Sequence, residues 1–289
     1  MSQKLTTPDG KKVRLYPTPP KDFDPLAATE KDLMKYGLPM RPDSRTAPEA
    51  AALWERQAAR YRNFEHLEPK LDLATAGDKP PVAANLGPTS QESCGYELTS
   101  FSAPFTSLFA TWTVPNLQYS PSPFGINRFH TFVGLGFLDI HVDMTVNSAN
   151  VVTSQIWAQS IGNVNLPVRP GDVISGSLCL NTNPAGTASY FLTNETTSQA
   201  VSFSVDTGFP PAVIINAGVT RSSVPPQPNP PLASFGIVYF DEISAYGVNG
   251  FKSLTSGTAV TMLNPSGKTL ARALKINDFT FKTVFDAAS

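Results

Sequence analysis

The stretch Val151-Val152-Thr153-Ser154-Gln155-Ile156-Trp157-Ala158-Gln159 carries the pattern that decides the fold class of this chain. Side chains of a β-strand point alternately to its two faces, so Gln155, Trp157 and Gln159 fall on one face and the residues between them on the other. The segment therefore predicts a strand with one polar, aromatic face and one face of small and apolar residues.

Similar short runs follow one another through most of the chain, separated by Gly, Pro, Asn and Ser turns. They are Leu108–Val114, His130–Gly136, Ile140–Val146, Asp172–Leu180, Thr187–Asn194, Ala200–Val205, Ala212–Val219, Ala233–Phe240, Ala259–Leu263, Leu270–Ile276 and Phe279–Phe285. Such spacing is typical of an antiparallel sandwich. No helical period of ten or more residues falls between the runs, which disfavours a doubly wound α/β sheet. We therefore expect an all-β, antiparallel β-sandwich.

Charge divides the chain into two parts. Residues 1–93 hold 27 of the 45 charged side chains, although charged residues make up only 16% of the whole, against about 25% in an average soluble domain. We expect an N-terminal helical arm and linker over residues 1–93 and a β-sandwich domain over residues 94–289.

Two helices are predicted in the arm. The first begins after Thr29 as N-cap and ends at Gly37. The second follows the capping box Thr46-Ala47-Pro48-Glu49, with Pro in its first turn. Aromatic residues recur along one face of this second helix: Trp54, Tyr61 and Phe64. Because a free helix of this length is marginal in water, we expect that face to dock on the sandwich.

Two further segments are expected to lack regular structure. Residues 71–93 are rich in Ala, Gly, Pro, Ser and Thr and are typical of a linker. Residues 222–231 contain five prolines in ten positions and predict an exposed, semi-rigid loop.

Composition also excludes several classes of protein. The net charge of −1 disfavours nucleic acid as a partner, and no apolar run approaches the roughly 18 residues that cross a membrane. The first dozen residues are polar, so we expect a cytoplasmic protein, or a secreted one if a leader precedes Met1. Cys94 and Cys179 are too few for a disulfide framework, and we expect both to be buried.

Common catalytic and cofactor motifs are absent: there is no GxSxG, GxxxxGK[ST], HExxH or CxxC. A metal site would have to draw on His130, His141 and Asp143, of which the last two share a strand face. Such short patterns are common by chance, so the sequence favours polar side chains on a wet strand face, with no metal and no cofactor. Asp241 and Glu242 are adjacent and would point to opposite faces. The sequon Asn194-Glu195-Thr196 predicts a turn.

Six strings, taken in order, resemble the eqolisins, which are glutamic peptidases. The strings are Phe109–Pro115 (FATWTVP), Phe132–Gly136 (FVGLG), Pro167–Asp172 (PVRPGD), Thr193–Thr197 (TNETT), Ala212–Asn216 (AVIIN) and Leu232–Phe235 (LASF). The resemblance implies a concanavalin A-like β-sandwich with a groove on its concave sheet. It also implies a Glu that activates water as general base and a Gln that helps to stabilise the oxyanion.

The site positions of that family are changed in this chain. His141 falls at the Gln, with a register uncertain by one or two residues, and Asn216 falls at the Glu. The aromatic residue of the family's first motif falls near Cys94, and the aspartate of its turn falls at Gly136. The pattern indicates a retained scaffold that has lost the acid-peptidase dyad.

Several functions follow as hypotheses. The first is a groove that binds a peptide, glycan or small molecule, lined by Gln155, Trp157, Gln159, Trp112 and His130. The second is an enzyme with a repurposed site, in which His141 is the base and Asn216 donates to an oxyanion. A divergent glutamic peptidase that recruits Glu97, Glu195 or Glu242 is a third. A fourth interpretation takes His141 and Asn216 as ordinary polar residues of the sheet.

Overall fold

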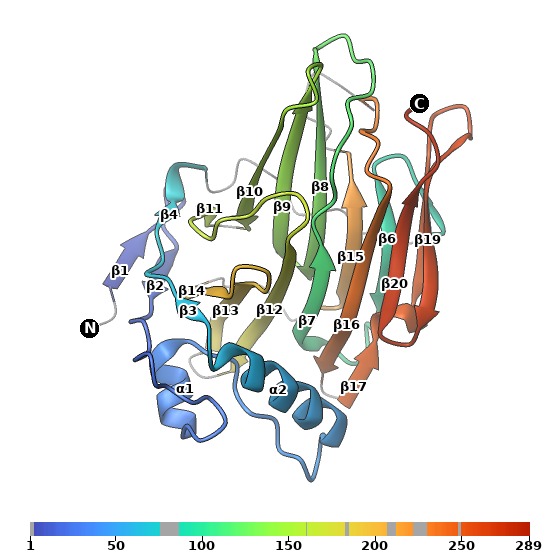
Figure 1. The fold of residues 1–289 in the computed structure, drawn as a ribbon. Helices are drawn as coiled ribbons and strands as arrows, with labels where there is room; N and C mark the ends of the chain where they lie inside the picture. The colour runs from blue at the N-terminus through green and yellow to red at the C-terminus, as the bar shows by residue number, and fades with distance from the viewer. Residues whose placement is uncertain are drawn as a thin grey trace.

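The computed structural model of the chain describes residues 3–75, 87–159, 161–182, 185–206, 212–221, 230–247 and 250–289. In these residues, strands form two sheets packed face to face, and two helices lie together at one end of the view in Figure 1. Nearly all pairs among these strands are antiparallel. In the described residues, the parallel pairs are β3 (Glu65–His66) with β14 (Gln199–Asp206) and β5 (Thr89–Ser90) with β18 (Thr258–Leu263). The predicted all-β antiparallel sandwich with a helical arm is confirmed.

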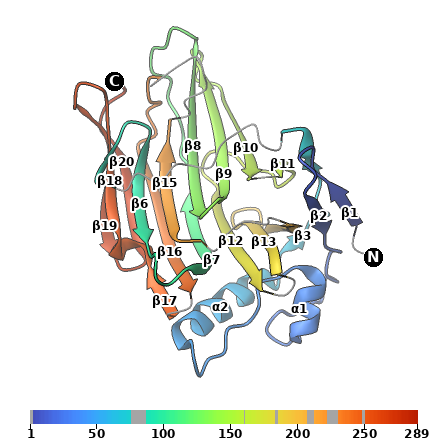
Figure 2. The ribbon, with the colours of Figure 1, turned by 180° about the vertical axis from the view of Figure 1, so that it is seen from behind.

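One sheet, here called sheet B, carries the residues of the candidate site. Its strands run in the order β4 (Leu71–Asp72), β11 (Gly162–Val164), β10 (Val152–Ala158), β9 (Leu138–Asn147), β8 (Ile126–Leu135), β15 (Ile214–Thr220), β6 (Ser93–Thr99) and β18 (Thr258–Leu263). Figure 2 shows the central strands β6, β15, β8, β9 and β10 side by side.

The second sheet, sheet A, lies behind it. Its order is β1 (Gln3–Thr6), β2 (Lys12–Leu15), β14 (Gln199–Asp206), β13 (Ala185–Asn194), β12 (Val173–Thr182), β7 (Phe105–Thr113), β16 (Ile237–Gly247), β20 (Thr280–Phe285), β19 (Thr269–Asn277) and β18. The short strands β3 (Glu65–His66), β17 (Gly250–Ser253) and β5 (Thr89–Ser90) pair with β14, β16 and β18. Because β18 pairs with both β6 and β19, it joins the two sheets along one edge.

The hydrophobic core fills the space between the sheets. Ile140 of sheet B reaches so close to Gly176 of sheet A that a Cβ added at Gly176 would lie 2.8 Å from its Cδ1. Trp112 is buried beside them, and its indole N–H donates to Thr131 Oγ1 at 2.9 Å. Contact this close leaves no room for a ligand between the sheets at this point.

The arm contains α1 (Glu30–Tyr36), α2 (Pro48–Tyr61) and the 3₁₀ turn η1 (Leu73–Thr75), with a second turn, η2 (Leu254–Ser256), near the C-terminus. The ends of α1 are as predicted: Thr29 Oγ1 accepts from Asp32 N–H, and Gly37 is left-handed with φ 67°. The predicted capping box of α2 is wrong. Ala47 is its N-cap, and the Thr46 hydroxyl instead donates to the Asp43 carbonyl.

The aromatic face of α2 docks on the outer surface of sheet A, as predicted. Trp54 and Tyr61 are buried in a cluster with Phe191 and Ala200, and the Tyr61 and Phe191 rings meet edge to face at 4.7 Å. The arm also adds β1, β2 and β3 to sheet A, strands that helical and linker patterns did not predict.

Other differences from the predicted elements concern boundaries. The predicted strand Ala233–Phe240 is β16, which starts at Ile237 and continues to Gly247, and β6 was not predicted. The ends of the predicted linker form β4, η1, β5 and the start of β6; residues 76–86 of that linker and residues 222–229 of the predicted proline-rich loop lie outside the described residues. No helix in the described ranges is both long and apolar enough to cross a membrane.

Candidate functional site

The face of sheet B turned away from sheet A, here called the polar face, collects polar side chains from five strands. Strand register places them in three rows: Glu97, Asn216, Gly134 and Asp139; then Gly95, Gly218, Phe132, His141 and Trp157; then Ser93, Thr220, His130, Asp143 and Gln155. The rows are two residues apart, so their members share a face. The intervening residues belong to the core.

In the first row, Asn216 lies between Glu97 on β6 and Asp139 on β9, with Gly134 of β8 between Asn216 and Asp139. Asn216 pairs with Glu97 on one side and with Gly134 on the other, and Gly134 pairs with Asp139. A Cβ added at Gly134 would lie 2.2 Å from Asn216 Oδ1 and 2.4 Å from Asp139 Oδ1. Both oxygens therefore lie over Gly134, in the space that a Cβ would fill, which only glycine allows at this position.

His141 lies in the second row and is tied to the first through Asp139. Its Nε2 is 3.5 Å from Asp139 Oδ2, and both residues are almost fully buried. The Trp157 ring meets the imidazole edge to face, with centroids 5.4 Å apart. The structure thus brings His141 and Asn216 to one face with Asp139 between them. The two-residue turn of the β8–β9 hairpin sets the register of these strands and pairs His141 with Phe132.

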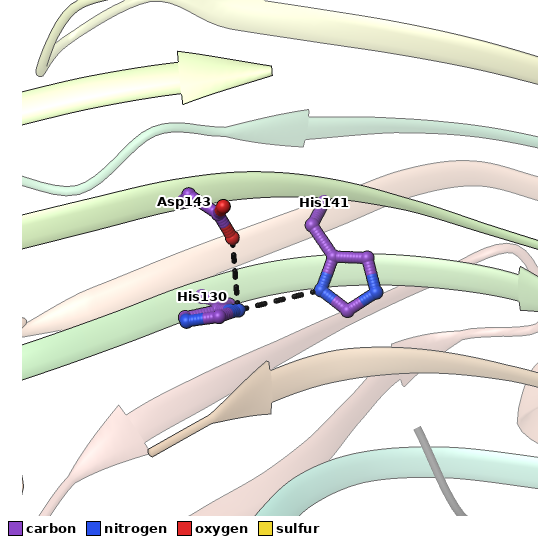
Figure 3. A group of neighbouring side chains, drawn as sticks. All are labelled: His130, His141 and Asp143. Carbon is purple, nitrogen blue, oxygen red and sulfur yellow. Dashed lines mark hydrogen bonds and ion pairs between the residues drawn. The ribbon is translucent and has the colours of Figure 1, made fainter. Parts of the chain in front are cut away.

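His130 and Asp143 of the third row form, together with His141 of the second row, a compact group of possible metal ligands, which Figure 3 draws. His130 Nδ1 is 2.9 Å from Asp143 Oδ1 and 3.4 Å from His141 Nδ1. One ligand atom from each residue lies within 4.8 Å of the others. The three side chains are 6%, 7% and 2% exposed for His130, Asp143 and His141, so the prediction of a wet strand face is wrong. These residues are buried although their face is turned away from the core.

A cavity of about 290 Å³ opens beside this group. Its lining is Arg128, His130, Asp143, Met144, Thr145, Thr153, Ser154 and Gln155. Of the residues predicted to line a groove, Gln155 and His130 therefore reach a cavity. Trp157, next to them on the polar face, is 1% exposed and does not line it.

Two predicted lining residues have other positions. Trp112 is on β7 of sheet A and packs in the core between the sheets, so its prediction as a groove residue fails. The alternation of a strand does not reveal which of two sheets it joins. Gln159 follows β10 directly, and its backbone N–H donates to the Asp139 carbonyl at 2.9 Å.

The carboxylates of the third hypothesis separate into two places. Glu97 is on the polar face next to Asn216, and is buried. Glu195 and Glu242 instead meet Arg60 of α2, whose guanidinium lies 3.9 Å and 2.6 Å from their carboxylates. Burial lowers the pKa of Arg60, but the hydrogen bond that Arg60 donates to Glu242 and the negative charges of Glu195 and Glu242 outweigh it and raise the pKa overall. These two glutamates therefore fasten the arm.

Asn194 of the glycosylation sequon is fully buried. Its side-chain amide donates to the Pro167 carbonyl and to Asp172 Oδ2 at 2.7 Å, and its Oδ1 accepts from the backbone of the following turn. The predicted turn is confirmed, and the side chain is not accessible to a glycosyl group.

Asp139 is the residue that sequence reasoning missed. Asp139 stands two positions before His141, and Asp143 stands two positions after His141. A period of two along one strand was the available signal.

Residues 91–282 match the model of the Peptidase A4 family. Among solved structures, the chain is similar to scytalido-glutamic peptidase bound to a peptide-based transition-state analogue, with 16% identity and a TM-score of 0.54 over 68% of this chain and 99% of that one. It is similar to the same extent to SCP-B, an eqolisin in complex with the tripeptide Ala-Ile-His. At this identity, the likeness shows the fold alone. No curated protein sequence matches the chain.

Proposed function

Because this chain belongs to the Peptidase A4 family, we propose that its polar face binds a peptide without performing glutamic-peptidase hydrolysis of the family's usual kind. The observation that carries the proposal is Asn216, which stands where the family resemblance requires the catalytic glutamate. An amide does not accept a proton from water, so it cannot be a general base. Its side chain is instead directed to Asp139 over Gly134.

The second dyad position supports the same conclusion. The resemblance places the family's glutamine at His141 or within two residues of it, where this chain has no glutamine. The His141 side chain is enclosed by Trp157, Phe132 and Asp139. An imidazole in this environment does not offer the amide N–H pair with which a glutamine holds an oxyanion. Both halves of the usual machinery are therefore exchanged, while the sheet that presents them is kept.

Peptide is the ligand class that the neighbouring structures support, since two of them hold peptide-based ligands. The cavity beside His130 offers groups that suit a peptide backbone and its terminal carboxylate: the Gln155 amide, the hydroxyls of Thr145 and Thr153, and the Arg128 guanidinium. Amide, hydroxyl and guanidinium groups are the donors and acceptors by which polypeptide segments are oriented in a cleft.

Binding is tested with a synthetic hexapeptide array, followed by calorimetric titration of the peptides that bind. Gln155→Ala is expected to weaken binding about tenfold, the effect of about one hydrogen bond. The matched control is Gln199→Ala, which removes a glutamine paired with Glu65 on sheet A and should leave binding unchanged. Binding of glycans or small molecules but of no peptide would contradict the proposal.

A second function, hydrolysis with new chemistry at the same face, is favoured by one specific observation: Asp139 lies between His141 and Asn216. A carboxylate that accepts from one imidazole nitrogen orients the other as a base. Glu97, beside Asn216, is the alternative base. Cleavage of a peptide that is lost in His141→Gln, or else in Glu97→Gln, would identify which residue acts.

A further inference from the structure

We propose that His130, His141 and Asp143 bind a divalent transition-metal ion of the zinc class through His130 Nδ1, His141 Nδ1 and the Asp143 carboxylate. The proposal does not depend on peptide binding, because it rests on the geometry of these three side chains and is tested without peptide.

The spacing of the three ligand atoms fits a tetrahedral ion. Zinc–nitrogen bonds of about 2.0–2.1 Å place neighbouring ligands of a tetrahedron about 3.3–3.4 Å apart. The two imidazole nitrogens are 3.4 Å apart, and His130 Nδ1 is 2.9 Å from Asp143 Oδ1. All three atoms lie within 4.8 Å of one another, so small rotations of the side chains suffice to bind one ion.

The second nitrogen of His141 is placed as it is in many zinc sites. Its Nε2 faces Asp139 Oδ2 at 3.5 Å. A proton on Nε2 that faces this carboxylate leaves the lone pair of Nδ1 directed at the other ligands (Figure 3). A carboxylate behind a histidine ligand holds the ring and its tautomer and strengthens it as a ligand.

Charge and access also suit a divalent cation. Asp139 and Asp143 together supply two negative charges in a buried place, which a doubly charged ion would balance. His130 and Asp143 line the cavity of about 290 Å³, whereas His141 lies behind them. Three protein ligands with the fourth position turned to a cavity is the arrangement of sites that exchange a water or a substrate group. Arg128, in the same cavity, would hold the charge of an anionic group bound there.

Metal binding and the use of His141 as a base exclude each other, because the ion would occupy Nδ1 and Asp139 faces Nε2. A bound ion therefore argues against the histidine-base hydrolase and is compatible with peptide binding and with metal-assisted chemistry.

The test uses the full chain, stripped of metal with a chelator and returned to chelator-free buffer at neutral pH. Calorimetric titration with zinc chloride is expected to give one ion per chain, and cobalt(II) is expected to give the visible absorption of a four-coordinate site. His130→Ala and Asp143→Asn should each weaken zinc binding at least about 100-fold, since each removes one of three ligands. Asp139→Asn should weaken it about 10–100-fold.

The chain offers one matched control. It has three histidines, and His66→Gln removes the one that lies on β3, outside the polar face. Zinc affinity should be unchanged in this variant. Thermal unfolding shows which variants fold. The cobalt spectrum of the unchanged chain tests the proposal without any variant. Absence of zinc binding in the unchanged chain, a six-coordinate cobalt spectrum, or equal affinity in folded His130→Ala would overturn the proposal.

Discussion

Gly134 is a position at which the polar face leaves no room for a side chain. It lies next to the C-terminal end of β8, between Asn216 on β15 and Asp139 on β9. Gly134→Ala adds one methyl group, whose carbon would lie 2.2 Å from Asn216 Oδ1 and 2.4 Å from Asp139 Oδ1. Ordinary contact requires about 3.4 Å, so each oxygen must move by about 1 Å.

The expected cost follows from the burial of these neighbours. Overpacking of a filled site costs about 1–3 kcal/mol. Replacing Gly by Ala also restricts the unfolded chain, which returns about 0.4–1 kcal/mol where the backbone conformation is permitted. We therefore expect Gly134→Ala to lower the free energy of unfolding by about 1–2 kcal/mol, a sizeable part of the about 5–15 kcal/mol typical of a domain.

The assay is urea unfolding at neutral pH, repeated in an Asn216→Ala background. Removing the Asn216 oxygen relieves the closer of the two contacts, so Gly134→Ala should cost less there, with a coupling energy of at least about 0.5 kcal/mol. If Gly134→Ala is as stable as the unchanged chain, or if its cost is the same in both backgrounds, the two oxygens do not lie over Gly134 and the arrangement of the first row is wrong.

Three further outcomes concern the rest of the molecule. Arg60→Met should lower the free energy of unfolding by about 1–2 kcal/mol, because it leaves the partly buried Glu195 and Glu242 without their cation; urea unfolding measures this, and a change below about 0.5 kcal/mol would show that the ion pairs do not fasten the arm. Burial lowers the pKa of His66 to about 4 from 6.5, so the unfolded chain binds a proton between these values that the folded chain does not, and stability should fall by up to about 3 kcal/mol as the pH drops through this range. The same pH series on His66→Gln should lack this part of the loss, and an identical pH dependence in both chains would contradict it. Burial raises the pKa of Cys94 to about 12, so iodoacetamide should not alkylate it in the folded chain at pH near 8; mass spectrometry that finds rapid alkylation without unfolding would refute its position in the core.

The sequence predicted the sheet faces wherever alternation was undisturbed. Gln155 and Trp157 share a face with His141 and Asp143, as the period of two requires. Where the period is broken, the prediction failed in a physical way. Glu242 adopts a positive φ of 51° at a bulge in β16, so the rule that adjacent residues alternate does not decide its direction.

Tertiary contacts explain the other differences. The residues from Thr46 to Glu49 match the capping-box pattern, but the Thr46 hydroxyl donates its hydrogen bond to the nearby Asp43 carbonyl instead. Trp112 has an alternating pattern like that of Trp157, and only the packing of one sheet against the other shows that Trp112 faces the core. Burial of His130, His141 and Asp143 depends on what lies over the polar face, which no local pattern contains.

The family resemblance indicated where a candidate site would lie, whereas composition did not. The sandwich is poor in carboxylates, and that scarcity favoured a site without them. The fold nevertheless brings Glu97, Asp139 and Asp143 to the same face as Asn216. Few charged residues in a domain therefore do not imply few at its site, because strands distant in sequence place them side by side.

Our proposal that Asn216 replaces the catalytic glutamate of the family is tested most directly by the rate at which the purified chain cleaves a denatured protein, followed by mass spectrometry from about pH 3 to about pH 8. We expect no cleavage at the acid end of this range, because the family resemblance places Asn216, which is not a carboxylate, at the position of the general base. Cleavage at acid pH that is abolished by Asn216→Ala would contradict this and would show that the altered dyad is still a glutamic-peptidase site.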